Sequence, residues 1–145
     1  MLEEFIENND LSAKIISSPT DLPVVAAIKQ KKFNPKIIAK TNLFISSKKD
    51  EILVITSFGK ELLIENVEKI VGEKLLGINE EESIELTGYK KNYIPPISVF
   101  GIKVIIDSDL ENLRYLVFPI SIKKYIKLPL EEILSYNEDV SFEKL

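Results

Sequence analysis

Residues 37–58 read IIAKTNLFISSKKDEILVITSF, and this stretch indicates the fold class most directly. Two runs rich in Ile, Val, Leu, Phe and Thr, at 37–46 and 51–58, flank the charged turn SKKD at 47–50. β-Branched and aromatic side chains favour strands, and a polar turn between two such runs separates two elements. We therefore predict two strands joined by this turn.

Outward from this pair, the pattern predicts short helices and further strands on both sides. The expected helices are 2–8, a helix capped by Thr20 or Asp21 that fades near Lys32, 65–71 closed by Gly72, 79–85 with Asn79 as cap and Gly88 after it, and 129–136. The other expected strands are 13–17, 75–76, 102–107, 113–118 and 120–128, and the 102–107 strand is apolar on both faces, as interior strands are.

The order of these elements is not a regular βαβ alternation, so we predict an α+β fold. We expect one domain over 1–145, with a mixed, partly barrel-like sheet of about six to seven strands and flanking helices. Residues 88–101 are predicted to form a loop that Pro95 and Pro96 stiffen, and the polar stretch 137–145 is expected to be a frayed tail.

Composition excludes several kinds of chemistry. The 145 residues include no Cys and no His, which excludes disulfides, thiolate metal sites, a cysteine nucleophile and a Ser-His-Asp triad. We expect no metal and no cofactor. There is no apolar run of membrane-spanning length, and the acidic segment 1–10 lacks a signal-peptide pattern, so we expect a cytoplasmic protein without a membrane partner.

The charge is distributed unevenly along the chain. The formal net charge is −4, which argues against an extended nucleic-acid-binding surface, and no DNA partner is expected. Residues 22–49, however, hold seven Lys and no acid, and residues 87–104 hold Lys90, Lys91 and Lys103 and no acid. If the two segments adjoin, they form a local cationic pocket for phosphates; alternatively, each Lys lies singly on the surface.

Two groups of carboxylates allow a functional and a structural interpretation. The run 80–82 could be a metal cluster, but acidic residues in the first turn of a helix are favoured by the helix dipole, and we prefer that interpretation. Asp107 and Asp109 follow a strand end, where sites often lie, but we prefer the interpretation that they form a turn that caps the next element.

Several stretches resemble one known family. NPKIIAKTNLF at 34–44 is similar to the n-P-x-x-(I/V)-x-K-(S/T)-L segment of the YbaK/prolyl-tRNA-synthetase-associated editing domains. TGY at 87–89, IPP at 94–96 and IKVIID at 102–107 resemble that family's T-G-Y-x-x-G-G-x-x-P loop and the strand after it. Ala26 and Ala27 resemble its A-A helix, and LPLEEI at 128–133 resembles its closing segment.

The resemblance implies a trans-acting aminoacyl-tRNA deacylase. Such a protein hydrolyses the ester of a mischarged small amino acid, of the Ala, Cys or Ser type, on a proline-class tRNA, with help from the terminal hydroxyl of the tRNA. The implied partners are the 3′ end of aminoacyl-tRNA and an aminoacyl-tRNA synthetase. An aminoacyl ester is already activated, so positioning and oxyanion stabilisation suffice without His or Cys.

The resemblance also implies roles for particular residues. Lys40 matches the family's catalytic lysine and would contact the terminal phosphate or ribose, Thr41 would hydrogen-bond the substrate, and Asp107 matches the acid that ends the following strand. The remaining expected substrate-binding residues are Gly88, Tyr89, Asn92, Tyr93, Pro95, Pro96 and Phe118.

The chain departs from the family pattern at its glycines. The loop glycines fall at Asn92 and Tyr93, and a second pair falls near Pro119 and Ile120. Glycine there allows close backbone approach, and Tyr adopts a positive φ only at a cost. Tyr93 and Phe118 could narrow or close the pocket. One alternative is therefore an inactive module of the same fold that binds a tRNA end or a synthetase; another is an unrelated interaction domain.

Overall fold

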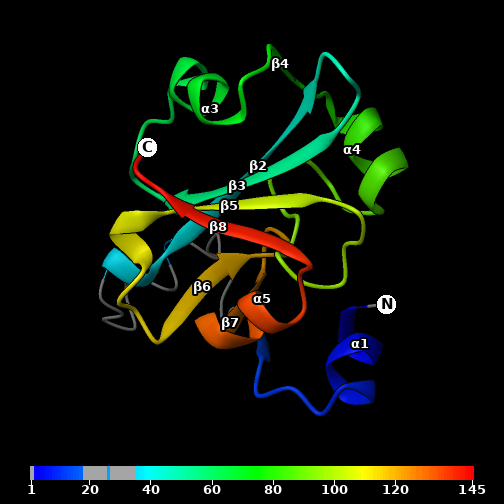
Figure 1. Cartoon of the computed structure of the whole chain (residues 1–145). Helices are drawn as coiled ribbons and strands as arrows, with labels where there is room; N and C mark the ends of the chain where they lie inside the picture. The colour runs from blue at the N-terminus through cyan, green and yellow to red at the C-terminus, as the bar shows by residue number, and fades with distance from the viewer. Residues whose placement is uncertain (1, 18–25, 27–34) are drawn as a thin grey trace.

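The computed structural model describes residues 2–17, 26 and 35–145, which form an α+β domain (Figure 1). The predicted helix from Thr20 or Asp21 to Lys32 lies outside the described residues except for Ala26, which is helical. The described helices are α1 (Leu2–Asn8), α3 (Ile64–Val71), α4 (Glu80–Thr87) and α5 (Leu130–Ser135), with short 3₁₀ turns η1 (Pro35–Ile37) and η2 (Ser108–Leu110).

The larger sheet has five strands in the order β4-β2-β3-β5-β8 (Figure 1). Strands β2 and β3 form the predicted pair and are antiparallel, with Lys40 opposite Thr56, whereas β5 and β8 run parallel to β3. These strands are β4 (Leu75–Gly77), β2 (Ala39–Ser46), β3 (Glu51–Ser57), β5 (Lys103–Asp107) and β8 (Asp139–Glu143).

The smaller sheet has the order β1-β7-β6 and is antiparallel throughout. Its strands are β1 (Lys14–Ser17), β7 (Lys124–Pro129) and β6 (Tyr115–Pro119). A parallel bridge between Ile38 and Val117 connects the two sheets beside the start of β2. The described residues thus contain eight strands, slightly more than predicted, in two sheets that do not close into one barrel.

The last strand corrects the prediction of a frayed tail over 137–145. Residues 139–143 form β8, which pairs with β5 in parallel register from Lys103↔Asp139 to Asp107↔Glu143. Val140 and Phe142 pack against the main core, which lies between the sheets. The stretch is polar on one face only, and its apolar residues alternate as in a half-buried strand.

Alternate residues of the larger sheet face two different cores. Leu43, Leu53 and Ile55 face the main core, whereas Ile52, Val54 and Ile105 face a second core under α3, which also contains Val67 and Leu75. We call these the inner face and the α3 face. No helix in the described part of the chain is long and apolar enough to cross a membrane.

Local signals end two helices where predicted. Asn79 caps α4 through a capping box, in which its side chain accepts from the Glu82 N–H at 2.8 Å and the Glu82 carboxylate accepts from the Asn79 N–H at 3.2 Å. Gly72 and Gly88 follow α3 and α4 with φ of 79° and 81°, a left-handed conformation that glycine adopts without a steric cost. The carboxylates at 80–82 lie in the first turn of α4, as we predicted. No group of three metal-ligating side chains is found among the residues that the structure describes.

Candidate functional site

Polar residues form a row across the α3 face at the carboxyl ends of the parallel strands. Lys40 lies opposite Thr56, and Thr56 and Asp107 each follow the paired residues Ile55 and Ile106. Ligand sites in sheets with parallel strands commonly lie at this end. We call Lys40, Thr56, Asp107 and Lys60 the polar row.

Asp107 anchors the row. Its side chain is 1% exposed, its carboxylate accepts from Lys60 Nζ at 2.6 Å, and it also accepts from the Asp109 N–H at 3.2 Å. The hydrogen bond to Asp107 raises the pKa of Lys60 above its usual value. The turn that follows β3 is thereby tied to the end of β5. Asp107 therefore has the capping role that was one of the two interpretations of its position in the sequence.

Thr56 on β3 and Lys40 on β2 continue the row across the sheet from Asp107 on β5. Thr56 is completely buried, and its Oγ1 has no hydrogen-bond partner among the described residues. Lys40 is half-buried and, by the alternation of β2, points to the same α3 face as Phe44. An unsatisfied buried hydroxyl beside a lysine is a costly arrangement that functional sites often retain.

Thr41 points to the opposite face of the sheet. Its hydroxyl is buried and donates to the Ile94 carbonyl at 2.8 Å, which fastens the proline loop to the start of β2. The structure thus brings the start of β2 and the proline loop side by side. The consecutive side chains of Lys40 and Thr41, however, point to opposite faces of the sheet. The substrate contacts expected of Lys40 and Thr41 remain predictions.

The loop after α4 has a well-defined hydrogen-bond network. Gly88 is exposed at the helix end, while Tyr89 is half-buried and its hydroxyl lies 2.8 Å from Ser98 Oγ. Burial is the main reason that the pKa of Tyr89 is raised above its usual value. The Ser83 hydroxyl, completely buried, donates to the Tyr89 carbonyl at 2.8 Å.

The lost family glycines leave no backbone strain. Asn92 is exposed, Tyr93 is half-buried, and the Tyr93 N–H donates to the Lys90 carbonyl at 2.9 Å. Neither Asn92 nor Tyr93 has a positive φ; in this part of the chain the positive angles belong to Gly88, Ser98 and Gly101. The loop therefore follows a path that ordinary residues adopt at both substituted positions.

The other expected substrate residues are buried. Pro95 and Pro96 are buried, and Asn137 Nδ2 donates to the Pro96 carbonyl at 2.6 Å. Phe118 is 1% exposed in the main core, where it supports the β6 strand from within. A direct role of Phe118 in binding remains a prediction.

The lysines of the two acid-free segments do not all gather at one place. Lys48 and Lys49 lie in the β2–β3 turn, at the end of β2 away from Lys40, and Lys103 begins β5 at that same end. Lys90 and Lys91 are exposed in the loop, and Lys29, Lys31 and Lys32 lie outside the described residues. The structure adds another cation, Lys60, to the same end of the sheet, where it is paired with Asp107.

Sequence analysis missed Thr56 and Lys60. Lys60 lies in residues 50–86, which hold ten acidic residues and three Lys, so counting charges by segment did not single it out. A usable signal was available, because Thr56 lies near the end of one predicted strand, Lys60 follows that strand, and Asp107 ends another. Parallel pairing of those strands would place them together.

The fold and the polar row define an α+β domain with a candidate site at the carboxyl ends of parallel strands. A family model described as an aminoacyl-tRNA editing domain matches residues 21–128, so the chain belongs to this family. This confirms the predicted family at that level.

Solved structures show the same fold. One is described as "a putative trans-editing enzyme for prolyl tRNA synthetase"; it has 18% identity and a TM-score of 0.85, with 99% of this chain and 93% of that chain covered. The crystal structure of a hypothetical protein has 19% identity and a TM-score of 0.82, with coverages of 98% and 97%. No curated protein sequence gives a significant match.

Proposed function

We propose that the chain is a YbaK-like trans-editing deacylase that hydrolyses the ester of a mischarged small aminoacyl-tRNA. Membership of the aminoacyl-tRNA editing family carries this proposal, and the similar fold of the trans-editing relative supports it. The amino acid would be of the Ala, Cys or Ser type on a proline-class tRNA. The site of action would be the cytoplasm, with a synthetase as a further partner.

In this proposal the polar row binds the tRNA end. Lys40 contacts the terminal phosphate or ribose, because a flexible point cation suits a phosphate. Lys60 is paired with Asp107 and Asp109, so its charge is compensated, and in this proposal the contact to the phosphate falls to Lys40. The terminal hydroxyl of the tRNA orients the attacking water, so that no strong protein base is needed.

The proline loop would form the wall of the amino-acid pocket. Thr41 holds this loop through Ile94, and the backbone near Gly88, Tyr89, Asn92 and Tyr93 would face the substrate, with Pro95 and Pro96 supporting it. A pocket of this kind selects by size, and one methylene changes binding by about 1–3 kcal/mol.

The direct test is hydrolysis of Ala-, Cys- and Ser-charged proline tRNA. For Lys40→Ala we expect the rate to fall about 100-fold, as on loss of one charge-stabilising contact. Lys48→Ala is the matched control, because Lys48 lies at the opposite end of β2, and its rate should stay within about twofold. A substrate with a deoxy terminal adenosine should also react slowly. Equal rates for both lysine variants would contradict the role of Lys40.

The second candidate is a binding module without hydrolytic activity. The replacement of the loop glycines by Asn92 and Tyr93 favours it, although both positions are unstrained. Tight binding of tRNA with no turnover on any of the three charged tRNAs would establish this alternative and refute the enzyme.

A further inference from the structure

A groove lies at the opposite ends of β3, β5 and β8 from the polar row. It has a volume of about 720 Å³, within the range of about 300–1,000 Å³ typical of binding pockets. Its floor is apolar and consists of Ile52, Val71, Val99 and Ile102, and its walls carry the carboxylates of Asp50, Glu51, Glu73, Glu138 and Asp139. We call it the acidic groove.

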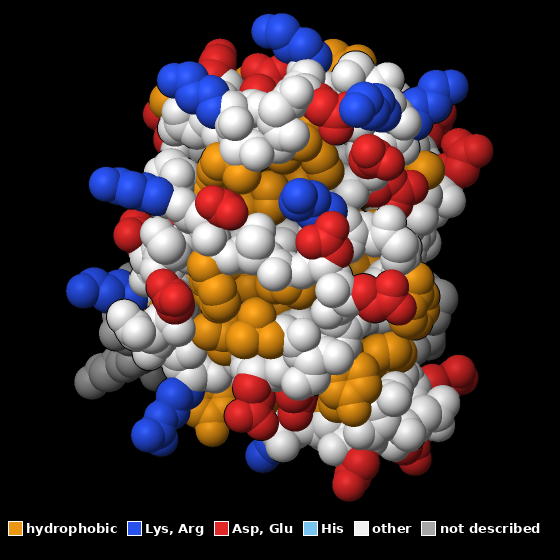
Figure 2. Space-filling model, in the orientation of Figure 1, with side chains coloured by type: hydrophobic (Ala, Val, Ile, Leu, Met, Phe, Trp, Pro, Cys, Tyr) orange, Lys and Arg blue, Asp and Glu red, His pale blue; other side chains and the backbone are white. Residues whose placement is uncertain are grey.

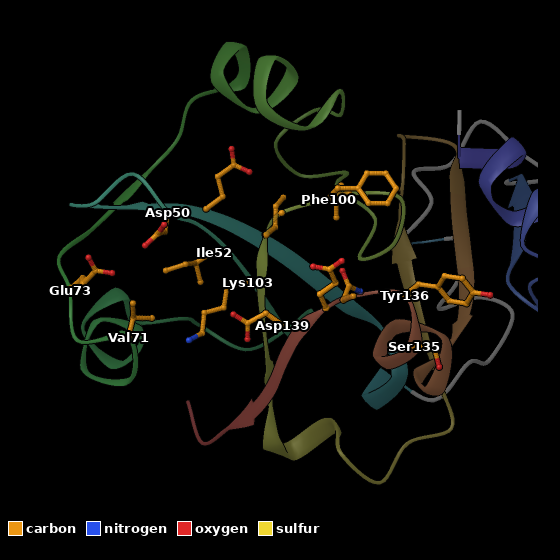
Figure 3. A pocket seen from close by; sticks show the side chains of 15 residues that line it. Asp50, Ile52, Val71, Glu73, Phe100, Lys103, Ser135, Tyr136 and Asp139 are labelled. Atoms are coloured by element: carbon orange, nitrogen blue, oxygen red, sulfur yellow. The ribbon is translucent and has the colours of Figure 1, made fainter.

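The charges of the acidic groove are not balanced within the chain. Lys103 is its single basic lining residue, and none of the five carboxylates has a hydrogen-bond or ion-pair partner among the described residues. Glu73 Oε1 is buried without a partner. Figure 3 shows Asp50, Glu73, Lys103 and Asp139 around Ile52 and Val71. A cation entering this groove would therefore meet several uncompensated carboxylates.

An exposed aromatic side chain marks one end of the groove. Phe100 is 76% exposed, and its ring lies edge-on to the ring of Phe5 with the two ring centroids 6.1 Å apart. The positive φ values of Ser98 and Gly101 turn the chain on either side of it. Tyr136 lies near the same end in Figure 3. Phe100 thus offers an apolar contact where the carboxylates offer charge.

The apolar surface continues past Phe100. A second hollow of about 490 Å³ shares Val99, Phe100 and Ile102 with the acidic groove and extends to Phe5 and Leu86. Figure 2 shows apolar surface with acidic side chains around it on one face of the molecule. Two connected hollows suit an extended segment better than a compact ligand.

The position of the groove separates it from the predicted tRNA site. Glu51 begins β3 and Thr56 lies near its end, and a strand of this length spans about 20 Å. Its carboxylates would also repel phosphates, so a tRNA is not the ligand that fits here.

We propose that the acidic groove docks a Lys/Arg-rich segment of a partner protein. Basic side chains of that segment lie against the carboxylates, and an apolar or aromatic side chain packs on Phe100. Charge complementarity to the five carboxylates indicates a basic partner. The exposed Phe100 favours a peptide over a small polyamine, because a polyamine has no apolar side chain that could pack on this ring. This proposal does not depend on deacylase activity.

The test uses three fluorescein-labelled peptides and fluorescence anisotropy with the full chain at about 0.15 M salt. KRLKFRKLKR carries both basic and apolar residues, KRSKSRKSKR lacks the apolar ones, and EELEFEELEE lacks the basic ones. We expect the first to bind and each of the others to bind at least about tenfold more weakly. Two-dimensional amide NMR spectra should place the shifts at the groove residues.

Variants of the groove make the test specific. Glu73→Gln with Asp139→Asn should weaken binding of the first peptide at least about tenfold, and Phe100→Ser should do the same. Glu81→Gln with Glu85→Gln is the matched control, because it removes the same charge from exposed positions of α4, and it should bind normally. Deacylation rates of all these variants should be unchanged, which separates this proposal from the proposed function.

Several outcomes would overturn the proposal. They are no binding up to about 1 mM, equal binding by the groove and control variants, or NMR shifts at Lys40 in place of the groove. Spermidine that competes fully with the peptide and is insensitive to Phe100→Ser would assign the groove to polyamines.

Discussion

Asp107 connects two segments that are far apart in sequence. Its buried carboxylate accepts from Lys60 Nζ, whose side chain is 29% exposed. Asp107→Asn keeps the size and a capping oxygen but removes the charge that Lys60 requires. We expect the free energy of unfolding to fall by about 1–3 kcal/mol in urea denaturation.

The control for this change is Asp109→Asn. Asp109 contacts the same ammonium at 3.4 Å but is 75% exposed, and exposed pairs contribute little, so the change should stay below about 0.5 kcal/mol. Equal losses in both variants would mean that burial of Asp107 is not what makes its ion pair important.

Glu51 gives a prediction for pH dependence. Burial raises the pKa of its carboxyl above the usual value. A group whose pKa is higher in the folded state stabilises the fold below its unfolded pKa, and this contribution is lost as pH rises through the folded pKa. At pH 7 the ionised carboxylate therefore opposes folding, and Glu51→Gln should raise the free energy of unfolding.

The gain should disappear near pH 3, where the carboxyl of the unchanged protein is protonated in both states. Urea denaturation at the two pH values measures it, with the exposed neighbour variant Asp50→Asn as control. A gain of the same size at both pH values would show that ionisation of Glu51 is not its cause.

At the scale of the element, β8 covers the edge of β5. Without β8, β5 would be an edge strand. Phe142 is half-buried against the main core, and Phe142→Ala should lower the free energy of unfolding by about 1–3 kcal/mol, somewhat less than for a fully buried Phe. Ser141→Ala lies between Val140 and Phe142 on the same strand and should change stability by less than about 0.5 kcal/mol. Urea denaturation of both variants tests whether β8 is docked in solution; no loss in Phe142→Ala would argue against it.

Predictability differs between elements for physical reasons. Helix α4 could be predicted at both ends, because Asn79, Glu82 and Gly88 act on hydrogen-bonding groups within a few residues of themselves. Strand β8 was missed, because five residues with only two apolar side chains have no stability apart from the edge of β5 on which they pair. The signals for α4 are local, and the partner of β8 is more than 30 residues away.

At the scale of the whole molecule, the charge distribution limits how much of a tRNA can be held. The net charge is −4, and the acidic groove adds carboxylates at the end away from Lys40. We expect the logarithm of kcat/KM for a charged tRNA to fall with the logarithm of salt concentration with a slope of about −1 to −2, as for a few phosphates of a single strand.

A charged acceptor minihelix should react within about threefold of the full-length tRNA, because few contacts extend beyond the 3′ end. Steady-state kinetics across salt concentrations measure both quantities. A slope steeper than about −4 would show an extended basic footprint, which these charges do not provide.

By itself, the sequence determined most of the described elements, though not β8, and the fold class. The β-branched and aromatic runs in 37–58 and the caps at Asn79 and Gly72 are properties of neighbouring residues, and the absence of His and Cys is a property of the composition. They were enough for an α+β fold, whereas the editing family was indicated by the resemblance of 34–44, 87–89, 94–96 and 102–107 to its motifs. The ordered motifs also located the strand that carries Lys40.

Only the tertiary structure decided which side chains meet. Period-two alternation in β2 sends Lys40 and Thr41 to opposite faces, and the parallel pairing of β3 with β5 brings Asp107 beside Thr56 and within reach of Lys60. It also decided that Asn92 and Tyr93 take unstrained angles, and that the carboxylates of distant segments line one groove. Such placements depend on pairing between strands that are distant in the chain, and no local pattern of residues specifies that register.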